Sequence, residues 1–264
     1  MTLSFYKYQG TGNDFIIIDN RDCEFHADET VIRNICDRRF GIGADGLLLL
    51  EPSEDADFRM VYFNSDGLES TFCGNGGRCI VELAHHLGII PRKTRFVAKD
   101  GFHEAWVVAE NLIRLKMQDV EIPVNHGDAV YLFTGSPHWV EFHQNVSSLP
   151  VRESGRKIRE AFSKEGTNVN FVEEKNGCLF VRTYERGVED ETLSCGTGVT
   201  ASALAAAGKG WKSPVEVETP GGKLQVEFTK NPDGSFSDVY LTGPTRFVFE
   251  GKVDVPALSV SSVS

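Results

Sequence analysis

The feature that most constrains the fold of this chain is a short unit that occurs twice. In each copy a cysteine precedes Gly-x-Gly and a run that ends at a glycine; Cys73 lies in the copy at residues 71–88 and Cys195 in the copy at residues 193–208. The first run places apolar residues at the spacing of an amphipathic helix, and the second is rich in alanine. Each unit therefore predicts a helix with its cysteine at the N-terminus.

The similarity between the copies extends beyond these helices. Tyr62 lies eleven residues before Cys73, and Tyr184 lies eleven residues before Cys195. Thr-Gly segments precede both units and strand–turn–strand patterns follow them, at residues 11–12, 134–135, 96–108 and 215–228. We therefore predict a duplicated half of roughly 120 residues.

Strand patterns outnumber helical ones, which predicts an α+β fold. We expect two pseudo-symmetric domains, each a mixed sheet or barrel wrapped around a central helix. The N-terminal half, residues 1–118 with about 245–264, carries Cys73, and the C-terminal half, residues 119–244, carries Cys195. The Ser/Val-rich residues 254–264 predict a frayed chain end.

The composition indicates which kinds of partner and which cellular compartment to expect. The 264 residues carry a formal net charge of −11, which disfavours nucleic acid and anionic membranes as partners. The apolar runs are strand-sized, and the first residues lack the apolar core of a secretory signal. Six cysteines are few for a disulfide scaffold, so we expect reduced thiols in a cytoplasmic protein.

A thiol at a helix N-terminus is expected to ionise readily, because unpaired amides and the helix dipole favour negative charge. If the two helices face each other across the pseudo-two-fold axis, Cys73 and Cys195 approach one bound molecule from opposite sides. One thiol can then remove a proton from a carbon next to a carboxylate while the other returns one to the opposite face. Amides at residues 74–75 and 196–197 suit that carboxylate. The chain has no nucleotide or pyridoxal motif, and we expect neither cofactor nor metal.

Eight motifs in this order and spacing resemble the diaminopimelate epimerase family, at residues 10–15, 63–67, 73–78, 137–138, 167–171, 184–187, 195–198 and 220–222. The resemblance implies a cofactor-independent two-thiol enzyme that interconverts LL- and meso-2,6-diaminopimelate, on the route to lysine and peptidoglycan. It also implies a site in the cleft between two similar domains, and a homodimer.

The resemblance also implies the residues of the site. Cys73 and Cys195 are the catalytic pair, and His138 with Glu185 would adjust their acidity. Substrate contacts fall on Asn13, Asn64, Gly74, Asn75, Asn168, Glu185, Arg186, Gly196 and Thr197. The four residues that follow the cysteines would hold the reacting carboxylate through their amides, and Arg186 would pair with the distal carboxylate.

Two positions depart from the family pattern. Ser136 stands where the family commonly has asparagine, so its shorter side chain needs a shift or a water to reach substrate. Phe249 stands where some relatives place an interface tyrosine, which removes a hydroxyl from that contact.

Two other functions remain open. A proline- or hydroxyproline-type racemase uses the same two-thiol logic. A redox-responsive anion-binding protein would instead join Cys73 and Cys195 in a reversible disulfide without turnover. The other four cysteines, Cys23, Cys36, Cys79 and Cys178, are interpreted as buried apolar residues.

Overall fold

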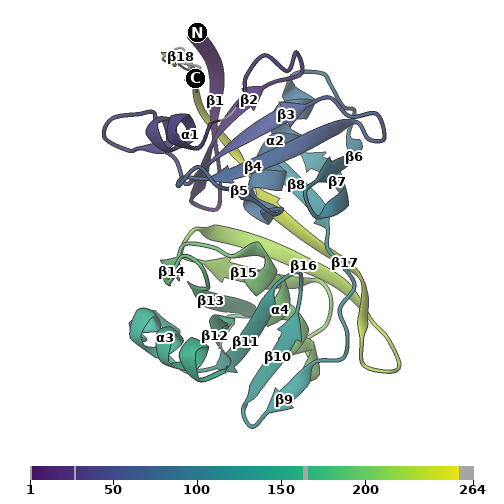
Figure 1. Cartoon of the computed structure of the whole chain (residues 1–264). Helices are drawn as coiled ribbons and strands as arrows, with labels where there is room; N and C mark the ends of the chain where they lie inside the picture. Colours follow the sequence, from purple (N-terminus) through teal and green to yellow (C-terminus); the bar gives the residue numbers. More distant parts are fainter. Residues whose placement is uncertain (1, 27, 163–165, 256–264) are drawn as a thin grey trace, which may run out of the picture.

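The computed structural model describes residues 2–26, 28–162 and 166–255, which form two lobes joined by a long strand (Figure 1). The upper lobe in Figure 1 contains β1 (Thr2–Gly10), β2 (Asn13–Asp19), α1 (Glu29–Cys36), β3 (Gly46–Glu51), β4 (Phe58–Asn64), β5 (Glu69–Ser70), α2 (Gly74–His86), β6 (Lys93–Ala98), β7 (Gly101–Ala109), β8 (Leu112–Lys116) and β18 (Arg246–Asp254). The last part of the predicted first domain and of the frayed end, residues 256–264, lies outside the described residues.

The lower lobe holds the second copy of the repeat. It contains β9 (Val124–His126), β10 (Ala129–Phe133), β11 (Pro137–Phe142), a 3₁₀ turn (Val146–Ser148), α3 (Val151–Phe162), β12 (Asn168–Lys175), β13 (Cys178–Glu185), β14 (Asp190–Thr192), α4 (Gly196–Gly208), β15 (Val215–Thr219), β16 (Gly222–Lys230) and β17 (Phe236–Pro244). Parallel and antiparallel pairs occur in both lobes, so the predicted α+β fold with mixed sheets is confirmed.

Strand pairing repeats from one lobe to the other. In the upper lobe β2 runs parallel to β3, β3 pairs antiparallel with β4, and β4 runs parallel to β6. In the lower lobe the same sequence of pairings joins β11 to β12, β12 to β13 and β13 to β15. The duplication read from the sequence is therefore also a duplication of topology.

Strand β17 belongs to the sheets of both lobes. Its residue Tyr240 pairs with Glu227 of β16 on one side and with Lys116 of β8 on the other. The 18 strands of the described residues consequently form one continuous hydrogen-bonded sheet, and β17 crosses the waist of the molecule in Figure 1.

Helices α2 and α4 lie inside the two lobes. The surface of α4 is apolar or small on every side, whereas α2 also buries polar side chains, among them Arg78 and Glu82. In α4 all residues from Gly198 to Ala207 are buried, and in α2 all residues from Asn75 to Ala84 are buried. Cys73 and Cys195 are the N-cap residues, and both have extended backbone conformations. The predicted position of each cysteine at a helix N-terminus is confirmed.

The second glycine of Cys195-Gly-Thr-Gly is required by close packing. A Cβ atom at Gly198 would lie 2.3 Å from Oδ1 of Asn170 and 3.3 Å from Cε1 of His138. The first turn of α4 therefore packs directly on β11 and β12, which brings polar side chains of both strands beneath Cys195.

The substitution Gly198→Ala tests this packing against Gly208→Ala in the same helix. Alanine favours helix by about 1 kcal/mol over glycine, but overpacking costs typically 1–3 kcal/mol. Gly208 has no atom within 4 Å of its added Cβ. We expect thermal unfolding to show a lower Tm for Gly198→Ala and an equal or higher Tm for Gly208→Ala. Equal stabilisation of both variants would contradict the close packing.

Candidate active site

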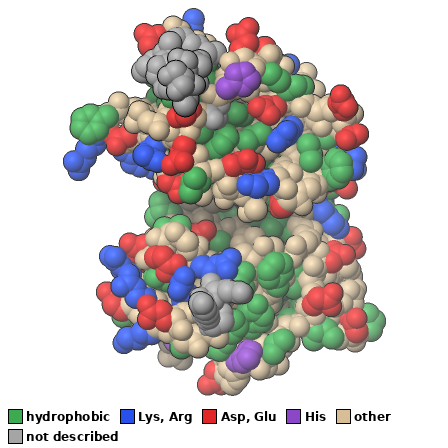
Figure 2. Space-filling model, in the orientation of Figure 1, with side chains coloured by type: hydrophobic (Ala, Val, Ile, Leu, Met, Phe, Trp, Pro, Cys, Tyr) green, Lys and Arg blue, Asp and Glu red, His purple; other side chains and the backbone are tan. Residues whose placement is uncertain are grey.

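A cleft of about 1280 Å³ lies between the lobes, where the molecule narrows at its waist (Figure 2). Both cysteines line it, together with predicted contacts from each lobe: Asn13, Asn64, Gly74, Asn75, Asn168, Glu185, Arg186, Gly196 and Thr197. His138 is fully buried behind this wall. The structure therefore brings the predicted site residues to one place.

The N-termini of α2 and α4 meet at the bottom of the cleft. A Cβ atom at Gly196 would lie 4.0 Å from Cα of Gly74. Neither N-cap cysteine accepts a capping hydrogen bond in its side chain. The first-turn amides of two helices are thus directed at one region, which suits a carboxylate.

Cys73 contacts an asparagine of its own lobe. Its Sγ lies 3.7 Å from Oδ1 of Asn13, within reach of a hydrogen bond donated by the thiol. Nδ2 of Asn75 donates to the same oxygen at 3.2 Å and to the carbonyl of Ser194 in the other lobe at 3.1 Å. Asn75 therefore ties the two lobes together beside the sulfur.

Cys195 contacts a hydroxyl instead. Oγ1 of Thr197 lies 3.4 Å from Sγ of Cys195 and 2.9 Å from Nε2 of His138. Nδ2 of Asn170 donates to Nδ1 of His138 at 3.0 Å, which leaves the imidazole proton on Nε2. Nε2 lies 2.9 Å from the Thr197 and the Ser136 hydroxyls alike, and the Thr197 hydroxyl in turn contacts the sulfur. His138 thus reaches Cys195 through Thr197.

Burial controls the ionisation of these groups. It lowers the pKa of His138 to about 3, assisted by the charge of Arg186, so the imidazole is neutral. Burial likewise raises the pKa of both thiols, and the carboxylate of Glu185 adds to this. The prediction of readily ionised thiols is wrong for the free protein, because desolvation outweighs the amides of the helix N-termini.

Polar groups at the far end of the cleft are bonded to the protein. Oε2 of Glu185 accepts from Thr192 at 2.9 Å, and burial raises the pKa of this carboxyl group. Oδ1 of Asn168 accepts from the backbone amide of Arg186 at 2.9 Å, and its Nδ2 donates to Ser136 at 3.1 Å. Ser136 also contacts His138 at 2.9 Å, so in the free protein its hydroxyl supports the wall of the site.

The family model of diaminopimelate epimerase matches residues 5–122 and 130–248 of the chain. The chain belongs to the diaminopimelate epimerase family. The family predicted from the motifs is therefore confirmed.

Relatives named diaminopimelate epimerase resemble the chain over nearly its whole length. The protein of Flavobacterium psychrophilum is 51% identical over 254 residues, which cover 94% of this chain and 99% of that protein. The protein of Chlorobaculum tepidum is 45% identical over 257 residues, with 92% and 98% covered.

Solved structures at lower identity share the fold. A PhzF-family phenazine biosynthesis protein of Bacillus anthracis has a TM-score of 0.74 at 18% identity and covers 97% of this chain and 100% of its own. A hydroxyproline epimerase of Agrobacterium vitis has a TM-score of 0.69 at 14% identity, with 96% and 92% covered. These likenesses extend the diaminopimelate epimerase fold to proteins with other names.

Four residues that contact predicted site residues were not themselves predicted as part of the site: Thr11, Asp45, Ser194 and Asn170. Asn170 had a usable signal, because it lies two positions after Asn168 and side chains at i and i+2 of a strand share one face. The interpretation of four buried cysteines is wrong for Cys23, which is exposed, and Cys178 is only partly buried. Cys36 and Cys79 are buried as predicted.

Within residues 2–26, 28–162 and 166–255, no three His, Cys, Asp or Glu side chains are grouped so that they could hold a metal ion. In the same part of the chain no helix has the length and apolar character needed to cross a membrane.

The raised thiol pKa values predict how the free protein reacts with iodoacetamide. Because only the thiolate reacts, modification should be slow near neutral pH and rise about tenfold per unit between about pH 6 and about pH 8. Cys73, which is partly exposed, should be modified before the buried Cys195. Peptide mass spectrometry measures both rates. A modification rate that stops rising below about pH 7 would show that the helix N-termini lower the thiol pKa values more than burial raises them.

Proposed function

We propose that the protein is a cofactor-independent epimerase that interconverts LL- and meso-2,6-diaminopimelate, with Cys73 and Cys195 as its acid and base. The observation that carries this proposal is the meeting of two thiol-capped helix N-termini in one cleft. Relatives at 51% and 45% identity, both named diaminopimelate epimerase, support the choice of substrate.

In the proposed reaction, the substrate carboxylate binds the amides of residues 74–75 and 196–197. One cysteine thiolate takes the proton from the α-carbon, and the electron pair left on carbon delocalises into the carboxylate. The amides of both helix termini stabilise this added charge. The other cysteine gives its thiol proton to the opposite face of the carbon, which inverts the centre and leaves the two thiols with exchanged protonation.

Burial makes this chemistry easier once a thiolate has formed. A thiolate whose conjugate thiol has a raised pKa is a stronger base, which suits the weakly acidic α-proton. The side chains behind Cys195, the buried neutral His138 and Thr197, provide surroundings that raise the thiol pKa in this way. We propose that His138 acts through Thr197, and that Glu185 acts through its charge.

We propose that the cleft recognises the distal end of diaminopimelate through one positively and one negatively charged side chain. Arg186 would take the distal carboxylate, and Glu185 the distal ammonium, with Asn64 and Asn168 at the sides of the cleft. Proline has no second charged end, so this lining favours diaminopimelate over a proline-type substrate. A purely redox-responsive protein would not need these charged groups.

The two halves defined from the sequence, residues 1–118 with about 245–264 and residues 119–244, are proposed to hold substrate between them. The Asn75–Ser194 bond and Gly12 beside Leu193 support such contact across the cleft. We also propose a cytoplasmic location, which the free cysteines of the described residues support.

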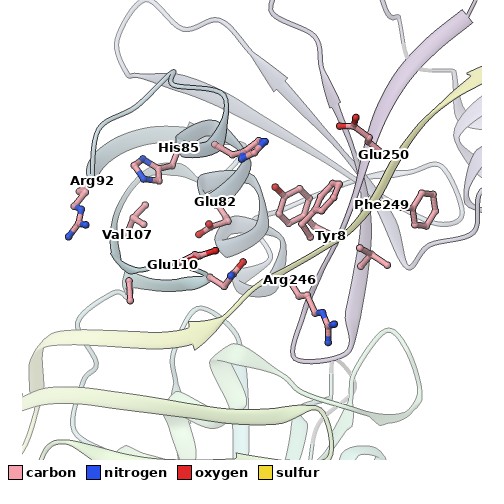
Figure 3. Close-up of a pocket in the computed structure, with 14 residues that line it drawn as sticks. Tyr8, Glu82, His85, Arg92, Val107, Glu110, Arg246, Phe249 and Glu250 are labelled. Atoms are coloured by element: carbon pink, nitrogen blue, oxygen red, sulfur yellow. The ribbon is translucent and has the colours of Figure 1, made fainter.

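A homodimer is proposed at the face formed by β1 and β18. Strand β18 exposes three consecutive apolar residues, Phe247, Val248 and Phe249. Beside them lies a hollow that Figure 3 shows between β18, β1 and helix α2, with Tyr8 and Glu82 pointing into it. Exposed apolar strips of this kind mark association surfaces, and Phe249 supports the contact without a tyrosine hydroxyl.

Deuterium incorporation at the α-carbon tests the two-thiol proposal. Without added cofactor, the wild type should epimerise LL-diaminopimelate and introduce solvent deuterium. Cys73→Ser and Cys195→Ser should each lose at least about a hundredfold in turnover, because a hydroxyl is far less acidic than a thiol. Thermal unfolding close to that of the wild type serves as the control. Near-normal turnover by either variant would remove its cysteine from the mechanism.

The variant Arg186→Lys tests the distal contact. An arginine fork gives a carboxylate two parallel hydrogen bonds that lysine cannot reproduce. Losing such a contact costs about 1.5–3 kcal/mol, so kcat/KM for diaminopimelate should fall roughly ten- to a hundredfold. Slow α-proton exchange of lysine, which has no distal carboxylate, should hardly change. Equal losses on both substrates would assign Arg186 to the support of the site.

A further inference from the structure

Two asparagine side chains link the Cys73 sulfur to charged groups of opposite sign. Nη2 of Arg78 donates to Oδ1 of Asn75 at 2.8 Å, and Nδ2 of Asn75 donates to Oδ1 of Asn13 at 3.2 Å. Nδ2 of Asn13 donates in turn to Oδ2 of Asp45 at 2.7 Å. The hydrogen bonds therefore run in one direction, from the guanidinium to the carboxylate.

The two ends fix the orientation of both carboxamides. A guanidinium has only donors and an ionised carboxylate only acceptors. Asn75 must therefore turn its oxygen to Arg78, and Asn13 must turn its nitrogen to Asp45. What remains for Cys73 is the oxygen of Asn13, 3.7 Å from Sγ.

Arg78 is held firmly at its end. Its side chain is fully buried, donates also to Oγ1 of Thr11 at 3.2 Å, and lies where a Cβ atom at Gly243 would be 3.0 Å from Nε. Burial lowers the pKa of its guanidinium. A buried cation is costly, so its retention here needs a reason, and the orientation of Asn75 supplies one.

Asp45 is held at the other end. Its Oδ1 accepts from Nη2 of Arg38 at 2.7 Å, and its Oδ2 accepts from the backbone amide of Asp14 at 3.2 Å. Both carboxylate oxygens thus face donors, so neither can be exchanged for an amino group without placing donor against donor.

We propose that Asp45 and Arg78 are positioning residues that keep the Asn13 oxygen on the Cys73 thiol, so that Cys73 holds its proton in the free enzyme. The inference rests on the two-thiol mechanism proposed above. A hydrogen bond donated by a thiol stabilises the protonated form, whereas one accepted by a sulfur stabilises the thiolate. Cys195 instead lies 3.4 Å from the Thr197 hydroxyl, a group that can donate to its sulfur as the Asn13 oxygen cannot. The network therefore makes the two sulfurs unequal before substrate arrives.

The other groups around Cys73 divide into two sets. Burial and the charge of Glu185 favour the protonated thiol. The amides of Asn75 and Gly76 and the charge of Arg78 favour the thiolate. The other titratable groups that interact with it are Tyr62, Cys79 and Cys195. Because these two sets oppose each other, the protonation of Cys73 depends on whether Asn13 turns its oxygen or its nitrogen toward the sulfur.

The rate of Cys73 alkylation by iodoacetamide, followed by peptide mass spectrometry across pH on the full chain, tests the proposal. In Asp45→Asn one carboxylate oxygen becomes an amino group and the charge is lost, so the acceptor that holds Nδ2 of Asn13 is weaker and the Asn13 oxygen is held less firmly on the sulfur. Alkylation at a given pH should become on the order of tenfold faster, which corresponds to one pKa unit. Asp233→Asn removes the same charge from an exposed turn, where it bonds Ser235, and should leave the rate unchanged.

A double-mutant cycle separates orientation from charge. In an Asn13→Ala background, Asp45→Asn should no longer accelerate alkylation, whereas Asn13→Ala alone should accelerate it by removing the acceptor. No acceleration by Asp45→Asn, or equal acceleration in both backgrounds, would overturn the proposal. If Asp45→Asn does not fold, unchanged alkylation in Asn13→Ala would overturn it equally. Alkylation needs no substrate, so failure to epimerise diaminopimelate would overturn the proposed function and leave this readout intact.

Discussion

The structure depends on the close approach of two helix N-termini, one from each lobe. Gly196 lies at this approach, because a Cβ atom there would be 3.1 Å from Cδ2 of Leu241 and 4.0 Å from Cα of Gly74. The consequence is a region in which the amides of both helix N-termini and two largely buried sulfurs lie together. Amide dipoles act strongly in such surroundings because the local dielectric is low. Substrate binding, acid–base chemistry and the contact between the lobes all depend on this geometry.

Burial works in two directions at this site. It suppresses ionisation of the thiols and keeps His138 neutral, so the free protein does not hold strongly acidic cysteines. It also makes every hydrogen bond at the sulfurs count for more, because no water replaces a lost partner. The direction of each bond then becomes chemically important. A neutral imidazole that contacts Thr197, and a carboxamide that offers Cys73 its oxygen, give the two sulfurs different surroundings.

Much of the fold and of the site could be predicted from sequence because the signals are local. A cysteine before Gly-x-Gly and a small-residue run defines both the helix and its N-cap, and the repeat shows that the arrangement occurs twice. The partners of Asn13 could not be predicted in this way. Asp45 bonds Asn13 from the loop before β3, and Arg78 of helix α2 acts on it through Asn75, so these contacts depend on side-chain packing between elements distant in sequence. The prediction of acidic thiols was wrong for a related reason. The sequence shows that each cysteine lies at a helix N-terminus, but the burial of that terminus depends on elements distant in sequence.

The pairing of β1 with β18 bears on how the chain is made. Thr2 lies opposite Asp254, so the first strand of the upper lobe finds this neighbour only when nearly the whole chain has been synthesised. The lower lobe, by contrast, is built from consecutive residues and can fold as soon as β17 emerges. That strand also supplies the partner of β8, so the later half acts as a template on which the earlier half is completed. A chain truncated before residue 246 would leave β1 paired with β2 alone, so the sheet of the first-made lobe would keep an open edge at β1.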